Sequence, residues 1–205
     1  KALVAGFLLA IMIPMIGIIM VNRKTSMIGD ALSHTALSGV GLGLILGFDP
    51  LIGSAIVCVI AAFLIELIRK KFPQYGDMAT AVIMSTGLGI AAILSDFAPG
   101  GNSFESYLFG SISSVTNMDV INISVIFVLI LAVSISQYSG LLAISIDKNI
   151  ARLAGVKVNR INAVFTFLSA ITIALAVKIV GALMVTSLIV LPVATALIIA
   201  KSYKK

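Results

Sequence analysis

The chain has 205 residues, of which 60% are hydrophobic and 11% are charged, and its mean hydropathy is +1.19. A soluble domain carries about 45–50% apolar and about 25% charged residues, so the composition excludes an ordinary soluble domain and predicts an all-α integral membrane protein. The net charge of +6 could suggest nucleic acid, but the placement of the basic residues argues against that partner, and the single Cys58 excludes an internal disulfide and a cysteine-based metal cluster.

Seven apolar segments are long enough to predict membrane-spanning helices, each of which needs roughly 20 residues. They cover 2–21, 28–47, 50–68, 78–95, 120–138, 161–177 and 179–200. We divide the last stretch near Lys178, because a helix over 161–200 would be ~60 Å long, twice the ~30 Å of a hydrocarbon core. One long tilted helix is the alternative. Residues 104–112 are apolar but too short to span, and they predict an external half-helix. We expect the chain to be truncated at one or both ends.

The basic residues predict the orientation of these segments. If the segments alternate and Arg23 is cytoplasmic, 12 of the 14 basic residues lie inside: Arg23, Lys24, Arg69, Lys70, Lys71, Lys148, Arg152, Lys157, Arg160, Lys201, Lys204 and Lys205. The outside then holds Lys1 and Lys178, with Asp49, Asp96, Glu105 and Asp119. We therefore expect a single transmembrane domain over 1–205, with a cytoplasmic loop at about 139–160.

Small residues recur at helical spacing in the second segment. Gly39, Gly43 and Gly47 are each four residues apart, so they share one face of a helix. In lipid such a face lets helix backbones approach closely. We interpret the three glycines as helix-packing residues.

The same segment carries a polar stripe. Ser26, Asp30, His34 and Ser38 fall four residues apart, and His34 is the only histidine in the chain. An ionisable side chain within a membrane segment is costly and normally faces the bundle interior or a pathway. A carboxylate and an imidazole one turn apart can share Zn²⁺ or Mn²⁺. The alternative is an Asp–His hydrogen bond that only fixes helix packing.

The cytoplasmic loop predicts a short helix of its own. Asp147 can cap a helix over Lys148–Ala154, and Gly155 suits the residue that follows its end. The residues that would share its apolar face are Ile150, Leu153 and Ala154. Such a helix offers a surface that a docking partner can hold, and an amphipathic helix resting on lipid is the alternative.

The stretch Ser26-Met-Ile-Gly-Asp-Ala-Leu-Ser-His-Thr-Ala-Leu-Ser-Gly-Val closely resembles the signature of the permease subunits of bacterial zinc/manganese ABC importers. The pattern continues through Tyr107–Ile112, Ala151–Val156, Val180–Val185 and Leu191–Thr195, in order along nearly the whole chain. The first stretch is the specific part, and the Gly-Ala-Leu and Leu-Pro stretches are weak alone. The resemblance implies a multi-pass helical permease of the bacterial plasma membrane.

The resemblance further implies that the permease dimerises or pairs, and that it works with cytoplasmic ATPase subunits and an extracytoplasmic metal-binding protein. Asp30 and His34 match the motif and become expected metal-pathway residues, with Zn²⁺ first and Mn²⁺ second as transported substrate and no permanent cofactor. The loop residues expected to couple to the ATPase are Asp147, Lys148, Ile150, Arg152, Leu153 and Gly155.

Energy for transport is expected to come from outside this chain. It contains no Gly-x-x-x-x-Gly-Lys-Ser/Thr loop for ATP, and it lacks the motifs of an intramembrane enzyme. We expect a transport subunit rather than an enzyme. The alternative is a proton-coupled secondary carrier of a metal or small solute, in which Asp30 and His34 relay protons.

Overall fold

The computed structural model describes residues 1–23, 25–98 and 102–199, and within these ranges it is helical, without a strand. The helices are α1 (Ala2–Asn22), α2 (Ser26–Leu46), α3 (Pro50–Lys71), α4 (Gly76–Phe97), α5 (Asn102–Phe109), α6 (Asn117–Ser136), α7 (Tyr138–Ile146), α8 (Lys148–Leu153), α9 (Val158–Val180) and α10 (Ala182–Ile199). Two short 3₁₀ turns are η1 (Pro73–Tyr75) and η2 (Ile112–Ser114).

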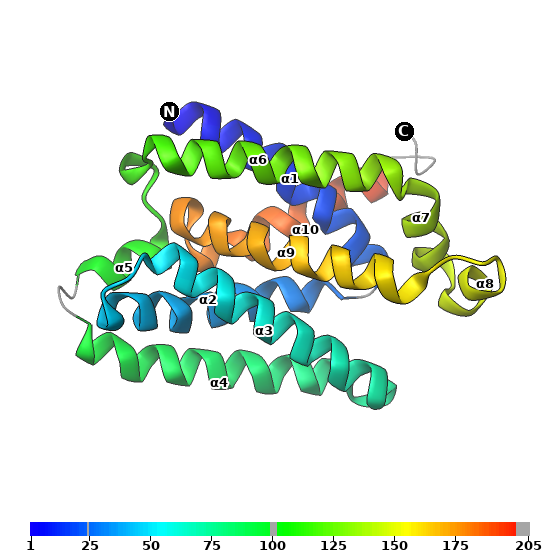
Figure 1. Ribbon diagram of the computed structural model, residues 1–205, viewed down its shortest axis with the longest axis horizontal. Helices are drawn as coiled ribbons and strands as arrows, with labels where there is room; N and C mark the ends of the chain where they lie inside the picture. The colour runs from blue at the N-terminus through cyan, green and yellow to red at the C-terminus, as the bar shows by residue number, and fades with distance from the viewer. Residues whose placement is uncertain (24, 99–101, 200–205) are drawn as a thin grey trace.

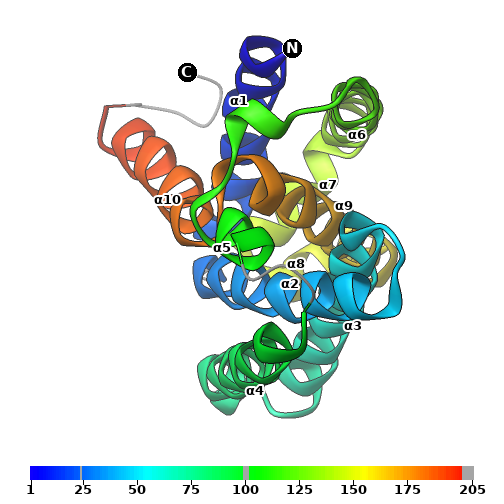
Figure 2. The ribbon, with the colours of Figure 1, turned by 90° about the vertical axis from the view of Figure 1, so that its left-hand side faces the viewer.

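The long helices form one bundle of membrane-spanning length (Figures 1 and 2). Among the described residues, six helical stretches are long and apolar enough to cross a membrane: α1, α3, η1 with α4, α6, α9 and α10. Helix α2 has 21 residues and packs against α1, α3, α4, α5, α9 and α10. Its serines, glycines, Asp30 and His34 make it less apolar than the others. The prediction of an all-α membrane protein with about seven spans is confirmed.

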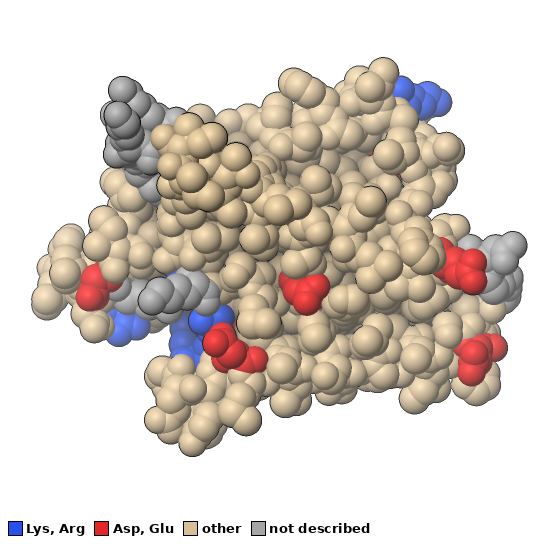
Figure 3. Space-filling model, turned by 180° about the vertical axis from the view of Figure 1, so that it is seen from behind, with Lys and Arg blue, Asp and Glu red and all other residues tan. Residues whose placement is uncertain are grey.

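The alternating helices place the described basic residues of the predicted inner loops at one end of the bundle. This basic end comprises Arg23, the C-terminus of α3 with Arg69–Lys71, and the segment 152–160, beside α7 and α8 in Figure 1. The space-filling view of the rear face shows most Lys and Arg gathered there (Figure 3). Lys24 and the basic residues after 199 lie outside the described residues. We call the other end, where α5 lies, the outer end.

Helices α9 and α10 are separated by a sharp turn, as predicted, and not joined into one long helix. The turn lies at Gly181, three residues after Lys178, with φ +91. A Cβ on Gly181 would lie 2.3 Å from the carbonyl carbon of Phe109, so the end of α5 rests directly on this turn. The predicted half-helix over 104–112 is thus present as α5, although it ends at Phe109.

One part of the cytoplasmic prediction is wrong. Residues 139–160 were expected to form a break with one short helix, but Tyr138–Ile146 form α7 as well. Helix α6 ends at Ser136, and the chain bends at Gln137. Helix α7 is largely apolar, but its nine residues are far too few to cross a membrane, so the criterion of spanning length did not predict it. It packs on α1 and α9 and carries the chain to α8.

The three glycines of α2 differ in their surroundings. A Cβ on Gly39 would lie 2.4 Å from the Gly53 carbonyl oxygen, and one on Gly43 would lie 2.7 Å from Pro50 Cα, so both are points of close approach to α3. Gly47 has open space around it. It ends α2 in the left-handed conformation, with φ +75, which is a helix-ending role and not one of packing.

Candidate functional site

The polar stripe of α2 divides into satisfied and available groups. Ser38 is buried, and its hydroxyl donates to the backbone carbonyl of Thr35 in its own helix at 2.7 Å. Ser26 is half-buried at the start of α2. The groups left for chemistry on this stripe are therefore the carboxylate of Asp30 and the imidazole of His34.

These two side chains lie together at a partly exposed position. His34 Nε2 is 3.5 Å from Asp30 Oδ1, and their side chains are 18% and 33% exposed, respectively. Thr186, in the second turn of α10, donates a hydrogen bond of 2.7 Å to the same Asp30 Oδ1. His34 Nδ1 is buried and has no partner among the described residues. Thr186 thus holds the Asp30 carboxylate, and the imidazole of His34 directs its Nε2 toward the same oxygen.

The spacing of the pair suits a shared cation. Zinc binds His nitrogen and carboxylate oxygen at ~2.0–2.2 Å, and two such ligands at a tetrahedral angle lie ~3.4 Å apart. The observed 3.5 Å between Nε2 and Oδ1 is close to that value. The described residues contain no group of three or more His, Cys, Asp or Glu that could hold a metal. Within the described chain the pair can therefore supply only part of a coordination shell, as a transient stop on a route would.

The Asp30–His34 pair faces the surface of this chain rather than the interior of its helix bundle. Met27 and Leu42, on the same side of α2, are 61% and 36% exposed. Facing a carboxylate to lipid costs about 2.5–3.5 kcal/mol near the bilayer centre on insertion scales. This face therefore needs protein or water against it when the subunit works.

The contact between Asp30 and Thr186 also shows that the outer end is recessed. Asp30 is in the second turn of α2, counted from the basic end, whereas Thr186 is in the second turn of α10, counted from the outer end. Two helices of spanning length whose second turns meet in this way cannot both begin at a membrane surface. Because the end of α5 contacts Gly181 and α5 packs on α2, α9 and α10 (Figure 2), we infer that the α9–α10 turn is the recessed start.

The short helix predicted in the cytoplasmic loop is present as α8. Asp147 Oδ1 accepts hydrogen bonds from the Asn149 and Ile150 amides at 2.6 and 3.2 Å, and Gly155 follows the helix end with φ +79. Ile150 and Leu153 are 64% and 89% exposed. Arg152 is exposed as well, while the Lys148 side chain lies outside what the structure describes. Helix α8 thus presents an apolar and basic surface at the basic end (Figure 1).

Some candidate residues were missed from the sequence. Thr186 carried no signal of its own, because a lone threonine in an apolar helix predicts nothing. Lys178 and Asp119 were both expected on the outer side of the membrane, but their pairing was not predicted: Lys178 Nζ lies 2.7 Å from Asp119 Oδ1, with side chains 20% and 5% exposed. The unexplained charge of Lys178 in an apolar run was a signal, because such a group needs a partner.

The model of the "ABC 3 transport" family matches residues 1–205 of this chain. The chain belongs to that family. It is therefore a membrane subunit of an ABC transporter, not an enzyme, and ATP hydrolysis resides on a separate partner chain.

Several curated proteins are similar along most of their length. A "Probable metal transport system membrane protein" of Treponema pallidum is 35% identical over 197 residues, covering 96% of this chain and 74% of the relative. The zinc uptake membrane protein ZnuB of Haemophilus influenzae is 30% identical, covering 95% and 75%. The manganese import permease ScaB of Streptococcus gordonii is also 30% identical, covering 100% and 73%.

A solved structure shows the same fold. PsaBC from Streptococcus pneumoniae, in complex with Fab, superposes with a TM-score of 0.86 at 29% identity, covering all of this chain and 74% of that one. The resemblance drawn from the Asp30–His34 segment is thus confirmed at the level of family and fold.

Proposed function

We propose that this chain is the membrane subunit of an ATP-driven importer that carries divalent transition-metal ions, zinc in first place and manganese in second, across the bacterial plasma membrane. The observation that carries the proposal is the Asp30–His34 pair, spaced at 3.5 Å and oriented by Thr186 on an exposed face of α2. Relatives named for zinc and for manganese support the substrate class.

The geometry indicates how an ion would pass. An extracytoplasmic metal-binding protein delivers the ion to the outer end, where Asp49 and Glu105 are exposed. The ion then passes α5 and reaches Asp30 and His34, which replace part of its water shell. Two ligands hold the ion weakly enough to release it, and Thr186 keeps the carboxylate in position, as an outer hydrogen-bond partner does in metal sites.

A second permease copy completes the route in this proposal. The Asp30–His34 face is partly exposed, and a lipid-facing carboxylate is unfavourable. A homodimer, or a paired permease, would cover the face and add the ligands that the described chain lacks. Lipid would then contact the other apolar faces of the bundle.

Helix α8 is the proposed contact with the cytoplasmic ATPase. Its cap, Asp147, fixes the first turn, and the exposed Ile150 and Leu153 offer apolar contacts that Arg152 flanks. Gly155 lets the chain turn back into α9. ATPase closure would push α8 and, through α7 and α9, shift the bundle.

The ligand types suit zinc better than manganese at equal availability, because affinity at nitrogen and oxygen sites rises along the series toward zinc. Geometry and delivery can override that order, and the relatives named for the two metals are equally identical to this chain. We place zinc first on the chemistry of the imidazole.

Metal uptake by point variants tests the proposal. Asp30→Ala and His34→Ala should each abolish metal-dependent growth and uptake in cells that carry the complete transporter, with membrane insertion unchanged. Asp77→Ala, which removes an exposed carboxylate from the first turn of α4, is the matched control and should transport normally. Normal uptake by both Asp30 and His34 variants would refute the pathway. Uptake that survives ATPase inactivation but stops when the proton gradient collapses would favour the carrier alternative.

A further inference from the structure

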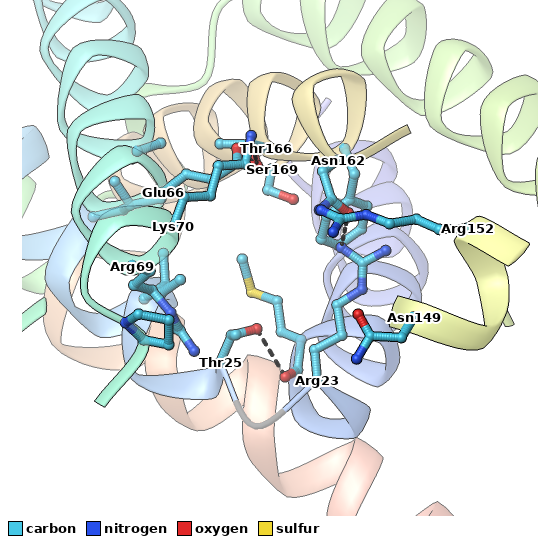
Figure 4. Close-up of a pocket in the computed structure, with 16 residues that line it drawn as sticks. Arg23, Thr25, Glu66, Arg69, Lys70, Asn149, Arg152, Asn162, Thr166 and Ser169 are labelled. Carbon is cyan, nitrogen blue, oxygen red and sulfur yellow. Dashed lines mark hydrogen bonds and ion pairs between the residues drawn. The ribbon is translucent and has the colours of Figure 1, made fainter. Parts of the chain in front are cut away.

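A polar cavity of about 580 Å³ opens at the basic end, and its lining includes Ile28 and Leu32 of α2 but neither Asp30 nor His34. Helices α1, α2, α3, α8 and α9 wall it (Figure 4). Its polar lining includes Arg23, Glu66, Arg69, Lys70, Arg152 and Ser169. Its volume is within the ~300–1,000 Å³ of small-molecule sites.

The charges around this cavity are unbalanced. Four lining side chains are cationic and one, Glu66, is a carboxylate. Glu66 is already engaged, since Oε1 lies 3.2 Å from Lys70 Nζ and Oε2 accepts a 3.0 Å hydrogen bond from Thr166. Arg69 and Arg152 form no ion pair with a described carboxylate. The cavity therefore favours an anion and disfavours a metal ion.

The walls hold the polar groups in place. Arg23 Nη1 donates to Asn162 Oδ1 at 2.9 Å, and its guanidinium lies 5.1 Å from the centre of the Phe165 ring. The start of α2 lies beside it at Thr25 and Ile28, so the positive end of a helix dipole adds to the cationic groups. These features give the cavity an ordered, positively charged wall, but they do not by themselves identify a ligand.

The hydroxyl of Ser169 is the feature that points to a ligand in this cavity. Its residue is 1% exposed, it lines the cavity from α9, and its Oγ has no hydrogen-bond partner among the described residues. In Figure 4 this hydroxyl turns toward the cavity, on the wall that also carries Glu66 and Thr166. A buried hydroxyl without a hydrogen-bond partner is unfavourable. A ligand oxygen in the cavity would accept its hydrogen bond.

We propose that this cavity binds a phosphate group, whether of a free phosphate compound or of a phospholipid headgroup of the cytoplasmic leaflet. Guanidinium groups match phosphate oxygens geometrically, and hydroxyls and helix N-termini complete such sites. This proposal rests on the cavity and its charges. It therefore does not depend on whether Asp30 and His34 bind metal.

The test uses the full-length permease, purified without its ATPase in phosphate-free buffer. In one arm, thermal unfolding is followed while inorganic phosphate replaces chloride at constant ionic strength. In the other, phospholipid retained by the protein is quantified by native mass spectrometry after exchange into phosphatidylglycerol or phosphatidylcholine. The variant is Arg69→Gln with Ser169→Ala, and the matched control is Arg160→Gln, an exposed arginine of α9 that does not line the cavity.

We expect phosphate or phosphatidylglycerol to stabilise the wild type and Arg160→Gln alike, and to bind the double variant at least about tenfold more weakly. Stabilisation by inorganic phosphate identifies a soluble ligand, and selective retention of phosphatidylglycerol identifies a lipid. Should the double variant unfold, Arg152→Gln on the exposed α8 replaces it. The proposal is overturned if the wild type binds neither probe, or if the variants bind as the wild type does.

Discussion

Replacing Thr186 by valine tests whether the carboxylate of Asp30 works as a held metal ligand. Valine keeps the shape of threonine but removes the hydroxyl that donates to Asp30 Oδ1 at 2.7 Å. Hydrogen bonds to charged groups contribute about 1.5–3 kcal/mol, and loss of such outer partners lowers metal affinity about 10–100-fold. Each factor of ten corresponds to about 1.4 kcal/mol, so the two ranges agree.

The assay is initial uptake of radioactive zinc into proteoliposomes that contain the complete transporter, at varied concentrations of metal-loaded binding protein. We expect Thr186→Val to raise the half-saturating concentration about 10–100-fold, and Thr186→Ser, which restores the hydroxyl, to recover most of the loss. A higher half-saturation with an unchanged maximal rate indicates lost ground-state binding. If the Thr186→Val variant transports like the wild type while Asp30→Ala is inactive, the orienting role assigned to Thr186 is wrong.

Three further predictions concern packing, charge and coupling. Gly39→Ala should destabilise the purified protein by about 1–3 kcal/mol in thermal unfolding, because its Cβ would meet the α3 backbone, whereas Gly89→Ala, with open space around it, should not. Lys178→Met should cost about 3–5 kcal/mol by leaving Asp119 buried and unpaired, and adding Asp119→Asn should recover most of it; equal stability of the single and double variants would contradict the pair. Leu153→Ser on α8 should uncouple the ATPase, seen as ATP hydrolysis that no longer responds to metal-loaded binding protein, without a change in stability.

Features that depend on neighbouring residues were predictable. The long apolar runs predicted the spans, because lipid permits only helices there. The four-residue spacing placed Asp30 and His34 on one face, and Asp147 was recognisable as a cap because capping is a contact within three residues. Each of these follows from helix geometry and the polarity of adjacent positions.

Features that depend on distant contacts were not predictable. Thr186 meets Asp30 across 156 positions, and Glu66 meets Thr166 across 100. The cavity at the basic end exists because five helices leave space between them, which no local pattern encodes. Helix α7 was missed for another reason, since a run of nine mostly apolar residues fits a short helix as well as a loop that packs on the bundle.

In the proposed metal route, the outer end and the Asp30–His34 pair are connected through the α9–α10 turn. The backbone of α5 rests on Gly181, and Thr186 follows only five residues later, ~7.5 Å along α10. Burial and the nearby carboxylates of Asp49 and Asp119 raise the pKa of Tyr107 on α5, so its phenol stays neutral at this acidic end. Lifting α5 to admit an ion would free the turn and loosen the hydrogen bond that holds Asp30. Asp30 would then be positioned to bind metal only after α5 has packed against the α9–α10 turn again. Spin labels on α5 and α10 whose separation stays fixed through the ATP cycle would rule out this link.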